Sequence, residues 1–300
     1  MDVSRRLLVR VLPLAAAVIT LGQTAADPDV ATVVNAAAAY VKEYQTQLGS
    51  VIADETYLQQ IIRQLPGDPA MPRMRRLTGE MFFMFAPTGE WLAIRDVIRA
   101  DGQEIKDRRV VADALRTLPA EQVAEAFKAY NSRFNLGRTI RNFNEPTLSL
   151  LVLDDRHRAR FTFDRRRVDR RRDGTLVTIA FTEREGETSL IRDLTSGAVV
   201  ARGEFVAEAD TGRIRRAVLR AKAGPVSLEL VTEYALDNDL ALWVPSRFRE
   251  RYESGVAPTS FEVEAEYEDV VCDATYSNYR RFQTSGRIKK LAPTLFRPAV

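Results

Sequence analysis

The sequence predicts an α+β protein: a curved antiparallel β half-barrel of about 10–11 strands, with helices covering its concave face. Three observations indicate this fold class. Apolar residues recur at helical spacing from Val30 to Leu48. Most of the chain after residue 158 consists of short strand-like runs separated by turn residues. Finally, GEMFFMFAP (79–87) is apolar on both faces of a strand.

The first 26 residues have the layout of a secretory signal. Early arginines precede an apolar run from Val11 to Gly22, and small residues follow just before Asp27. This run is shorter than the roughly 20 residues of a membrane span, and no later stretch is apolar enough to cross a bilayer. We therefore expect cleavage near Ala26 and an exported protein, located in the periplasm or outside the cell. Residues 27–300 are expected to form a single half-barrel domain, with a helical insertion near 108–157.

The N-terminal half supplies the expected cover of the sheet. The helix over 30–48 has one apolar face, and after Gly49 the pattern changes to that of a long strand over 51–65. Because the strand over 79–87 is apolar on both faces, it must be covered on both sides. The expected lid is the helical section that follows, in which a helix begins at Pro119. Its apolar stripe is formed by Val123, Phe127, Tyr130 and Phe134.

Charges alternate along the strands near the C-terminus. In FEVEAEYED the glutamates fall on the face opposite the apolar residues, and the preceding strand carries arginines at the same spacing. We expect a cross-strand ladder on the solvent face, which fixes the register of the strands more than it adds stability. Its predicted members are Arg247, Arg249, Arg251, Glu262, Glu264, Glu266 and Glu268.

The stretch ATYSNYRRF (274–282) is predicted to pair with the glutamate-rich strand and to continue the ladder through Arg280 or Arg281. Strict alternation over this stretch leaves either a tyrosine outside or a polar residue inside. A hollow or helix-covered concave face accommodates this pattern better than a tightly filled sandwich.

The sequence offers little for catalysis. His157 is the only histidine, and its position among charged residues in DDRHRAR favours a solvated loop residue over a general base. Cys272 is the only cysteine, which excludes an internal disulfide and favours a buried, inert thiol. No metal-binding or phosphate-loop motif is present, so we expect no metal, no cofactor and no enzyme activity. A hydrolase that uses two carboxylates distant in sequence remains an open alternative.

An arginine-rich segment, RHRARFTFDRRRVDRRR (156–172), is the most unusual feature of the composition. It is interpreted either as a solvated hairpin or as a surface that binds an anion or an acidic partner, because guanidinium groups match phosphate and carboxylate geometry. Nucleic acid is not an expected partner outside the cytoplasm, which leaves an anionic lipid head group or an envelope protein. The candidate residues are Arg165, Arg166, Arg167, Arg170, Arg171 and Arg172.

The order of these elements, with DTGRIRRAVL and LWVPSRFRERY near the end of the meander, resembles the superfamily of periplasmic lipoprotein carriers and outer-membrane lipoprotein receptors. The chain is also similar to uncharacterised secreted bacterial proteins that end in a TYSNYRRF-like strand. The resemblance implies a half-open antiparallel barrel that holds helices in its concavity, and a lipid or lipoprotein as partner. The chain departs from the carriers in its longer middle section, 108–172.

Two hypotheses of function follow. The first is an envelope binding protein whose concave sheet holds an apolar or amphipathic ligand, such as a lipid or acyl chain. The candidate lining of its binding site consists of Phe83, Phe85, Trp91, Phe181, Phe205, Tyr234 and Trp243. The second is a non-catalytic scaffold or interaction protein that docks an envelope partner through the arginine-rich hairpin.

Overall fold

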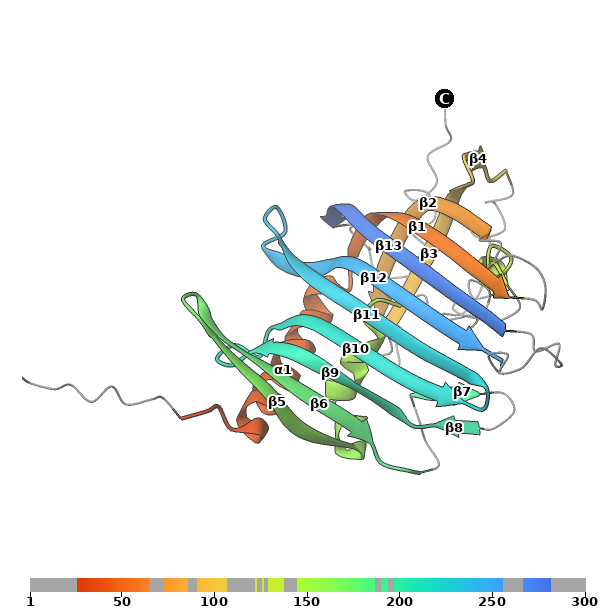
Figure 1. Cartoon of the computed structure of the whole chain (residues 1–300). Helices are drawn as coiled ribbons and strands as arrows, with labels where there is room; N and C mark the ends of the chain where they lie inside the picture. The colour runs from red at the N-terminus through yellow and green to blue at the C-terminus, as the bar shows by residue number, and fades with distance from the viewer. Residues whose placement is uncertain are drawn as a thin grey trace, which may run out of the picture.

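A large antiparallel sheet dominates the computed structural model (Figure 1), which describes residues 26–64, 73–85, 91–106, 122, 126, 129–137, 145–186, 190–193, 197–255 and 267–281. Its strands are β1 (Val51–Gln64), β2 (Arg73–Phe85), β3 (Trp91–Ala100), β4 (Gln103–Glu104), β5 (Phe161–Arg171), β6 (Gly174–Glu183), β9 (Ala201–Glu208), β10 (Ile214–Ala223), β11 (Val226–Asp237), β12 (Leu242–Ser254) and β13 (Tyr267–Arg281). Two short strands, β7 (Ile191–Asp193) and β8 (Gly197–Val199), pair separately.

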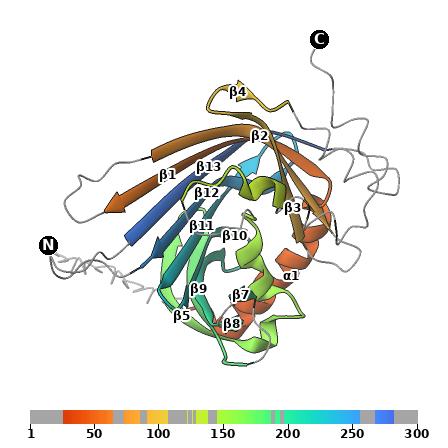
Figure 2. The same ribbon diagram turned by 90° about the vertical axis from the view of Figure 1, so that its right-hand side faces the viewer.

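The order of the 11 strands in the main sheet is β4-β3-β2-β1-β13-β12-β11-β10-β9-β6-β5. The first long strand therefore pairs with the last one, and β4 and β5 are the edges of a sheet that does not close. The sheet curves, and α1 (Val30–Leu48) lies inside the curve (Figure 2). The prediction of a curved antiparallel half-barrel with helices on its concave side is confirmed.

α1 forms where the sequence predicts it. The carboxylate of Asp29 accepts a hydrogen bond from the backbone N–H of Thr32 (3.0 Å) and so caps the first turn. The helix ends before Gly49, whose N–H donates to the Gln45 carbonyl. Its buried face is the predicted apolar stripe, namely Val33, Val34, Ala37, Ala38, Val41, Tyr44 and Leu48.

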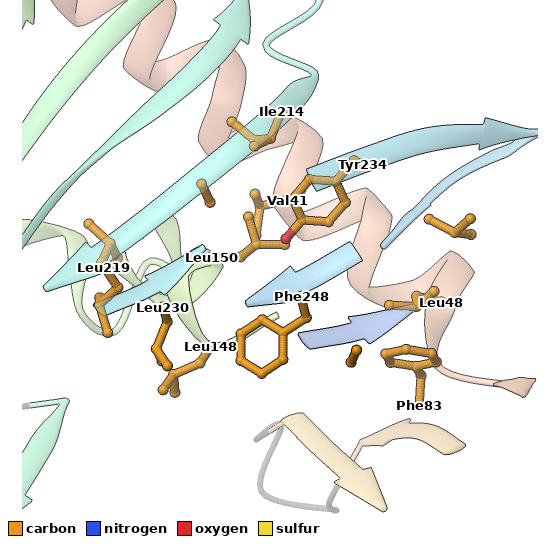
Figure 3. Close-up of a cluster of buried hydrophobic side chains, with 14 of the residues drawn as sticks. Val41, Leu48, Phe83, Leu148, Leu150, Ile214, Leu219, Leu230, Tyr234 and Phe248 are labelled. Atoms are coloured by element: carbon orange, nitrogen blue, oxygen red, sulfur yellow. The ribbon is translucent and has the colours of Figure 1, made fainter. Parts of the chain in front are cut away.

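The concavity holds a core of buried hydrophobic side chains (Figure 3). Besides α1, the 3₁₀ helix η1 (Leu148–Leu153) packs inside the curve and contacts both α1 and β10. The side chains that meet there include Val41, Leu48, Leu148, Leu150, Ile214, Leu219, Leu230 and Phe248, all of them buried. The protein's own side chains therefore cover the middle of the concave face.

β2 is covered on both faces, as its composition predicts. Successive residues Met81, Phe82 and Phe83 are each at most 3% exposed. Part of the expected lid lies over the inner face of the neighbouring strands, because the side chains of Gln59 and Arg75 both donate to the carbonyl of Phe134 (2.9 and 3.0 Å). Tyr130 is buried as well, whereas Val123 and Phe127 lie outside the described residues.

The pattern of the last strand differs from its prediction. ATYSNYRRF does not pair with a separate glutamate-rich strand, because its described part belongs to the same continuous strand, β13. Tyr276 and Tyr279 are both buried, at 8% and 9% exposure. A register shift opposite Ile52 and Asp54 places Asn278 in the left-handed region (φ 51°), which turns the chain so that two tyrosines an odd number of positions apart point the same way. The expected conflict between a tyrosine outside and a polar residue inside is thus removed by a β-bulge.

The expected charge ladder is correct for the arginines and wrong for Glu268. Arg247, Arg249 and Arg251 lie on the exposed face of β12, but their carboxylate partners are Asp273, Asp269 and Glu253. Glu268 is buried at 6% exposure, because the register of β13 places it on the inner face with Val270 and Cys272. Glu262, Glu264 and Glu266 lie outside the described residues.

Candidate functional site

A groove with a volume of about 520 Å³ is lined by residues in and beside the β5–β6, β9–β10 and β11–β12 turns. All three turns lie at the same end of the sheet (Figure 1). Its apolar wall contains Leu176, Tyr234, Leu236 and Trp243. Its charged rim contains Arg171, Asp173, Glu208, Asp210 and Arg215, and Gly174, Thr175, Thr211 and Ala235 complete the lining. The groove is the candidate binding site.

Exposed apolar surface marks this groove. Leu236 is 48% exposed, and it is one of three large hydrophobic side chains that the described part of the chain leaves exposed. Trp243 is half-buried beside it. Exposing such side chains to water is unfavourable, so a groove that presents them together is suited to an apolar group of a ligand.

The wall of the groove is held by an electrostatic network around Arg215. Its guanidinium lies 3.6 Å from the centre of the Trp243 ring, and its Nη2 pairs with the Glu208 carboxylate at 2.5 Å. Glu208 also accepts a hydrogen bond from Thr211 (2.6 Å) and pairs with Arg213 (3.3 Å). These contacts fix the position of the indole ring.

α1 supports the same wall from behind. Tyr40 and Tyr44 stack on the helix with ring centres 5.5 Å apart, and Tyr44 meets the edge of Tyr234 at 6.3 Å. Burial raises the pKa of the Tyr40 phenol, while Arg213 acts in the opposite direction. Tyr234 is anchored by its hydroxyl, which donates to the Pro146 carbonyl next to η1 (3.3 Å).

The predicted aromatic residues whose side chains are described fall into two groups. Phe83, Phe181 and Phe205 are core residues with at most 2% exposure, and Phe181 stacks on Phe205 at 4.7 Å. Tyr234 and Trp243 line the groove. The backbones of Phe85 and Trp91 pair across β2 and β3, and their side chains lie outside the described set.

The arginines of the predicted surface also fall into two groups, and the first binds the segment before α1. Arg165 donates to the Pro28 carbonyl (2.8 Å) and pairs with Asp27 (3.3 Å), and Arg170 pairs with Asp27 at 2.6 Å. These two residues therefore tie the segment before α1 to the edge strand β5. The hydrogen bond from Arg170 lowers the pKa of the Asp27 carboxyl.

The remaining arginines of this surface face solvent. Arg171 pairs with Asp169 at 2.7 Å and lines the groove. Arg166, Arg167 and Arg172 are exposed. Arg167 interacts electrostatically with the Asp169 carboxylate, whereas Arg166 and Arg172 form no ion pair within the described residues. The groove is thus lined by members of both predicted sets: Tyr234 and Trp243 of the aromatic set, and Arg171 of the arginine segment.

A second polar cluster is buried inside the other half of the concavity. It consists of Glu55, Tyr57, Arg95, Glu250 and Tyr252, here called the Glu55 cluster. Arg95 forms a bidentate ion pair with Glu55, and its guanidinium lies 3.9 Å from the centre of the Tyr57 ring. The hydroxyls of Tyr57 (3.0 Å) and Tyr252 both donate to Glu250. Burial, reinforced by the Glu250 carboxylate, raises the pKa of the Tyr57 phenol well above its ordinary value.

The other residues singled out from the sequence have structural positions. His157 is half-buried in the turn before the 3₁₀ helix η2 (Arg158–Arg160), and burial lowers the pKa of its imidazole. Cys272 is fully buried in β13, as predicted. Across the described ranges, no group of three or more histidine, cysteine, aspartate or glutamate side chains is arranged to hold a metal ion. Among the helices of those ranges, none combines the length and apolar composition needed to cross a membrane.

Sequence reasoning missed most of the groove. Glu208, Asp210 and Arg215 belong to the stretch around DTGRIRRA, which the sequence marks as a turn between strands, and Leu236 is one apolar residue among many. The one available signal was the aromatic pair Tyr234 and Trp243, because each lies near the same β11–β12 turn.

Comparison with known proteins finds only distant similarity, to solved structures. No family model matches it, and no curated protein matches it significantly. A DUF1329 family protein from Desulfovibrio piger has 13% identity and a TM-score of 0.35, with 90% of this chain and 100% of that one covered. A LolA superfamily protein from Nitrosomonas europaea has 13% identity and a TM-score of 0.30, with 86% and 96% covered.

A lipovitellin structure described by its lipid–protein interactions has 7% identity and a TM-score of 0.32. The match covers 80% of this chain but spans only 26% of the lipovitellin chain.

Proposed function

We propose that this protein is an exported, non-catalytic envelope protein that binds an apolar or amphipathic ligand, such as a lipid or an acyl chain. The observation that carries the proposal is the groove bounded by Tyr234, Leu236 and Trp243 on one side and by charged side chains on its rim. Its volume of about 520 Å³ lies within the range of about 300–1,000 Å³ that is typical of small-molecule sites. An apolar wall with a charged rim suits a ligand that has an apolar chain and a polar head.

The solid core supports this placement of the ligand. Phe181 and Phe205 stack against each other beneath the helices, so a ligand in the middle of the concavity would have to displace packed side chains. The groove requires no such displacement, because Leu236 and Trp243 are already accessible. We therefore assign ligand contact to Tyr234 and Trp243, and we assign Phe83, Phe181 and Phe205 to the support of the sheet.

The two carboxylates of the Glu55 cluster are engaged inside the protein. Glu55 is engaged by Arg95, and Glu250 accepts hydrogen bonds from Tyr57 and Tyr252. A general acid or base has to reach a substrate, and both of these carboxylates are at most 4% exposed.

The proposed export agrees with the structure of the segment that follows the expected cleavage site. Asp27 and Pro28, which come directly after Ala26, are bound by Arg165 and Arg170 of β5. The folded domain thus makes contacts from residue 27 onward. The intact mass of protein recovered from the envelope tests the assignment, since cleavage after Ala26 gives a chain that begins at Asp27, and an uncleaved chain contradicts it.

The binding proposal can be tested with a tryptophan reporter. The chain has two tryptophans, so Trp91→Phe leaves Trp243 as the single emitter at the groove. A palmitate brominated along its chain should quench this emission in a saturable manner, whereas unbrominated palmitate should compete without quenching. Absence of both effects, together with only ligand-free protein in native mass spectra of material purified from its own envelope, would overturn the proposal. Circular dichroism confirms that the variant is folded.

A second candidate function, docking of an acidic envelope partner, is favoured by Arg166, Arg167 and Arg172. These side chains are exposed, and among the described residues only Arg167 interacts with a carboxylate, that of Asp169. Their combined replacement by alanine should abolish capture of the partner at low salt, and higher salt should weaken capture by the unmodified protein. Arg202→Ala, an exposed arginine of β9, is the matched control. Unchanged capture by the triple variant would exclude this surface.

A further inference from the structure

One arginine covers the aromatic wall of the groove. The guanidinium of Arg215 lies 3.6 Å from the centre of the Trp243 ring, and both residues line the groove. The guanidinium of Arg213 lies farther from the same ring, at 5.6 Å. Arg215 therefore occupies the aromatic face that the apolar part of a ligand would otherwise contact.

The backbone of β10 gives Arg215 this position. The register of β10 against β9 shifts between Ile214 and Arg216, so Arg215 is the extra residue of a β-bulge. A bulge changes the direction of a side chain relative to the regular alternation of the strand, and bulges are frequent beside functional sites. The position of the guanidinium over the ring thus follows from a local irregularity of the strand.

The guanidinium of Arg215 uses only part of its hydrogen-bonding capacity. Its Nη2 pairs with the Glu208 carboxylate at 2.5 Å, and Glu208 is shared with Arg213 (3.3 Å). The Nε atom of Arg215 is buried and has no hydrogen-bond partner within the described residues. A buried donor without an acceptor is unfavourable, so the stacked position is not the best one for every atom of the group. Because 29% of the side chain is exposed, the guanidinium can move toward water.

We propose that Arg215 is a movable cover of the groove, which a ligand displaces from the Trp243 ring before its apolar chain contacts that face. The inference rests on the proposed function and adds the residue that controls access to its site. Without a ligand the covered state is favoured, because the ring attracts the guanidinium and Glu208 holds it nearby. An apolar chain that contacts the indole competes with this attraction.

Removal of Arg215 distinguishes a cover from a residue that only supports the wall. If Arg215 only held the indole in place, Arg215→Ala would weaken the binding of a ligand. A cover predicts the opposite sign, because the ligand no longer has to displace the guanidinium. The expected gain in affinity is about two- to fivefold, which corresponds to one partly exposed contact between a cation and an aromatic ring.

The test uses Trp243 as the single emitter in the Trp91→Phe background. Acrylamide quenching measures how accessible the ring is without a ligand, and calorimetry measures the affinity for dodecyl maltoside below its critical micelle concentration. This ligand is uncharged, so the loss of the arginine charge does not by itself change its binding. Arg215→Ala should raise both the acrylamide quenching and the affinity.

Two further variants complete the test. Glu208→Gln removes the ionic partner of Arg215 without shortening the arginine, so it should also raise acrylamide quenching. Arg220→Ala is the matched control, because Arg220 belongs to the same strand, pairs with Glu229 at 2.6 Å and does not line the groove. This control should alter neither measurement. Circular dichroism confirms that each variant is folded.

The outcomes separate the inference from the proposed function. Unchanged acrylamide quenching in Arg215→Ala, or an affinity of this variant for dodecyl maltoside that is unchanged, weaker or absent, overturns the inference. Saturable quenching of Trp243 by brominated palmitate would in that case still support the binding function. If neither dodecyl maltoside nor palmitate binds any form of the protein, both proposals fail.

Discussion

Among single residues, the charges of the inner face and those of the outer face have different energetic roles. Arg95 and Glu55 form an ion pair at 3% and 4% exposure, whereas Arg220 and Glu229 pair at 2.6 Å on the surface with about 40% of each side chain exposed. Removing one member of a buried pair leaves the other charge without compensation in a medium that solvates it poorly. An exposed charge that loses its partner is solvated by water instead.

Arg95→Ala should therefore lower the free energy of unfolding by about 3–5 kcal/mol. Arg220→Ala, the surface control, should lower it by less than about 1 kcal/mol. Urea titrations followed by circular dichroism measure both. A loss of similar size in the two variants would show that Glu55 gains access to water when Arg95 is removed.

Asp154 links single residues to the acid stability of the fold. Its carboxylate accepts hydrogen bonds from the Arg156 guanidinium (2.8 Å) and from Gln45 of α1 (3.2 Å). Burial by itself would raise the pKa of Asp154, but these hydrogen bonds outweigh burial and lower the pKa from 3.8 to about 2. A lowered folded-state pKa contributes stability that is present above pH 3.8 and is lost as the pH falls toward 2.

Asp154→Asn should therefore lower the free energy of unfolding at neutral pH. It should also lessen the further loss of stability that the wild type shows as the pH falls from 3.8 to about 2, the range between the two pKa values of Asp154. The difference between wild type and variant in urea midpoints across this pH range isolates the contribution of this carboxyl. Asp155→Asn removes the neighbouring exposed carboxylate and serves as the control. A variant curve parallel to that of the wild type would exclude the assignment.

At the scale of secondary-structure elements, α1 and the β9–β10 turn are in close contact. Gly212 in this turn has a positive φ of 67°, and a Cβ added there would lie 2.1 Å from the backbone carbon of Ala36 in α1. The turn and the helix therefore touch backbone to backbone. This contact sets the position of α1 relative to Glu208, Asp210 and Thr211, all of which line the groove.

Gly212→Ala should cost at least about 2 kcal/mol of folding free energy, because it combines backbone strain with a clash against a helix backbone. Gly224→Ala is a control of similar backbone conformation (φ 54°) with open space around it, and it should cost about 1 kcal/mol. Thermal unfolding compares the two variants. Equal costs would mean that α1 shifts away from the turn without losing contacts elsewhere.

In the molecule as a whole, the first and the last long strand of the sequence pair with each other inside the sheet. β1 and β13 pair along nearly their full lengths, and both lie in the interior of the strand order. Cys272 lies in the middle of β13 with 0% exposure, opposite Gln59 of β1. A reagent reaches this thiol only when the centre of the sheet opens.

Modification of Cys272 by a thiol reagent should therefore report global unfolding. We expect no reaction in native buffer over hours, and a urea dependence whose midpoint coincides with that of circular dichroism. Since Cys272 is the only cysteine of the chain, the signal has a single source. Reaction well before the circular dichroism transition would mean that β13 separates from β1 or β12 in a partial opening.

The sequence by itself determined the elements and the fold class. The stripe of α1, the two-sided burial of Met81, Phe82 and Phe83, and the exposed alternation of arginines on β12 depend on the period of a helix or strand, which neighbouring residues express directly. The burial of Cys272 follows from the same local pattern.

Only the tertiary structure decided how these elements meet. The bulge at Asn278 and the inward position of Glu268 depend on the register between strands, and register is a property of pairs of strands rather than of either one. The division of the arginine segment depends on where Asp27 lies, and the groove depends on three turns that are distant in the sequence but share one end of the sheet.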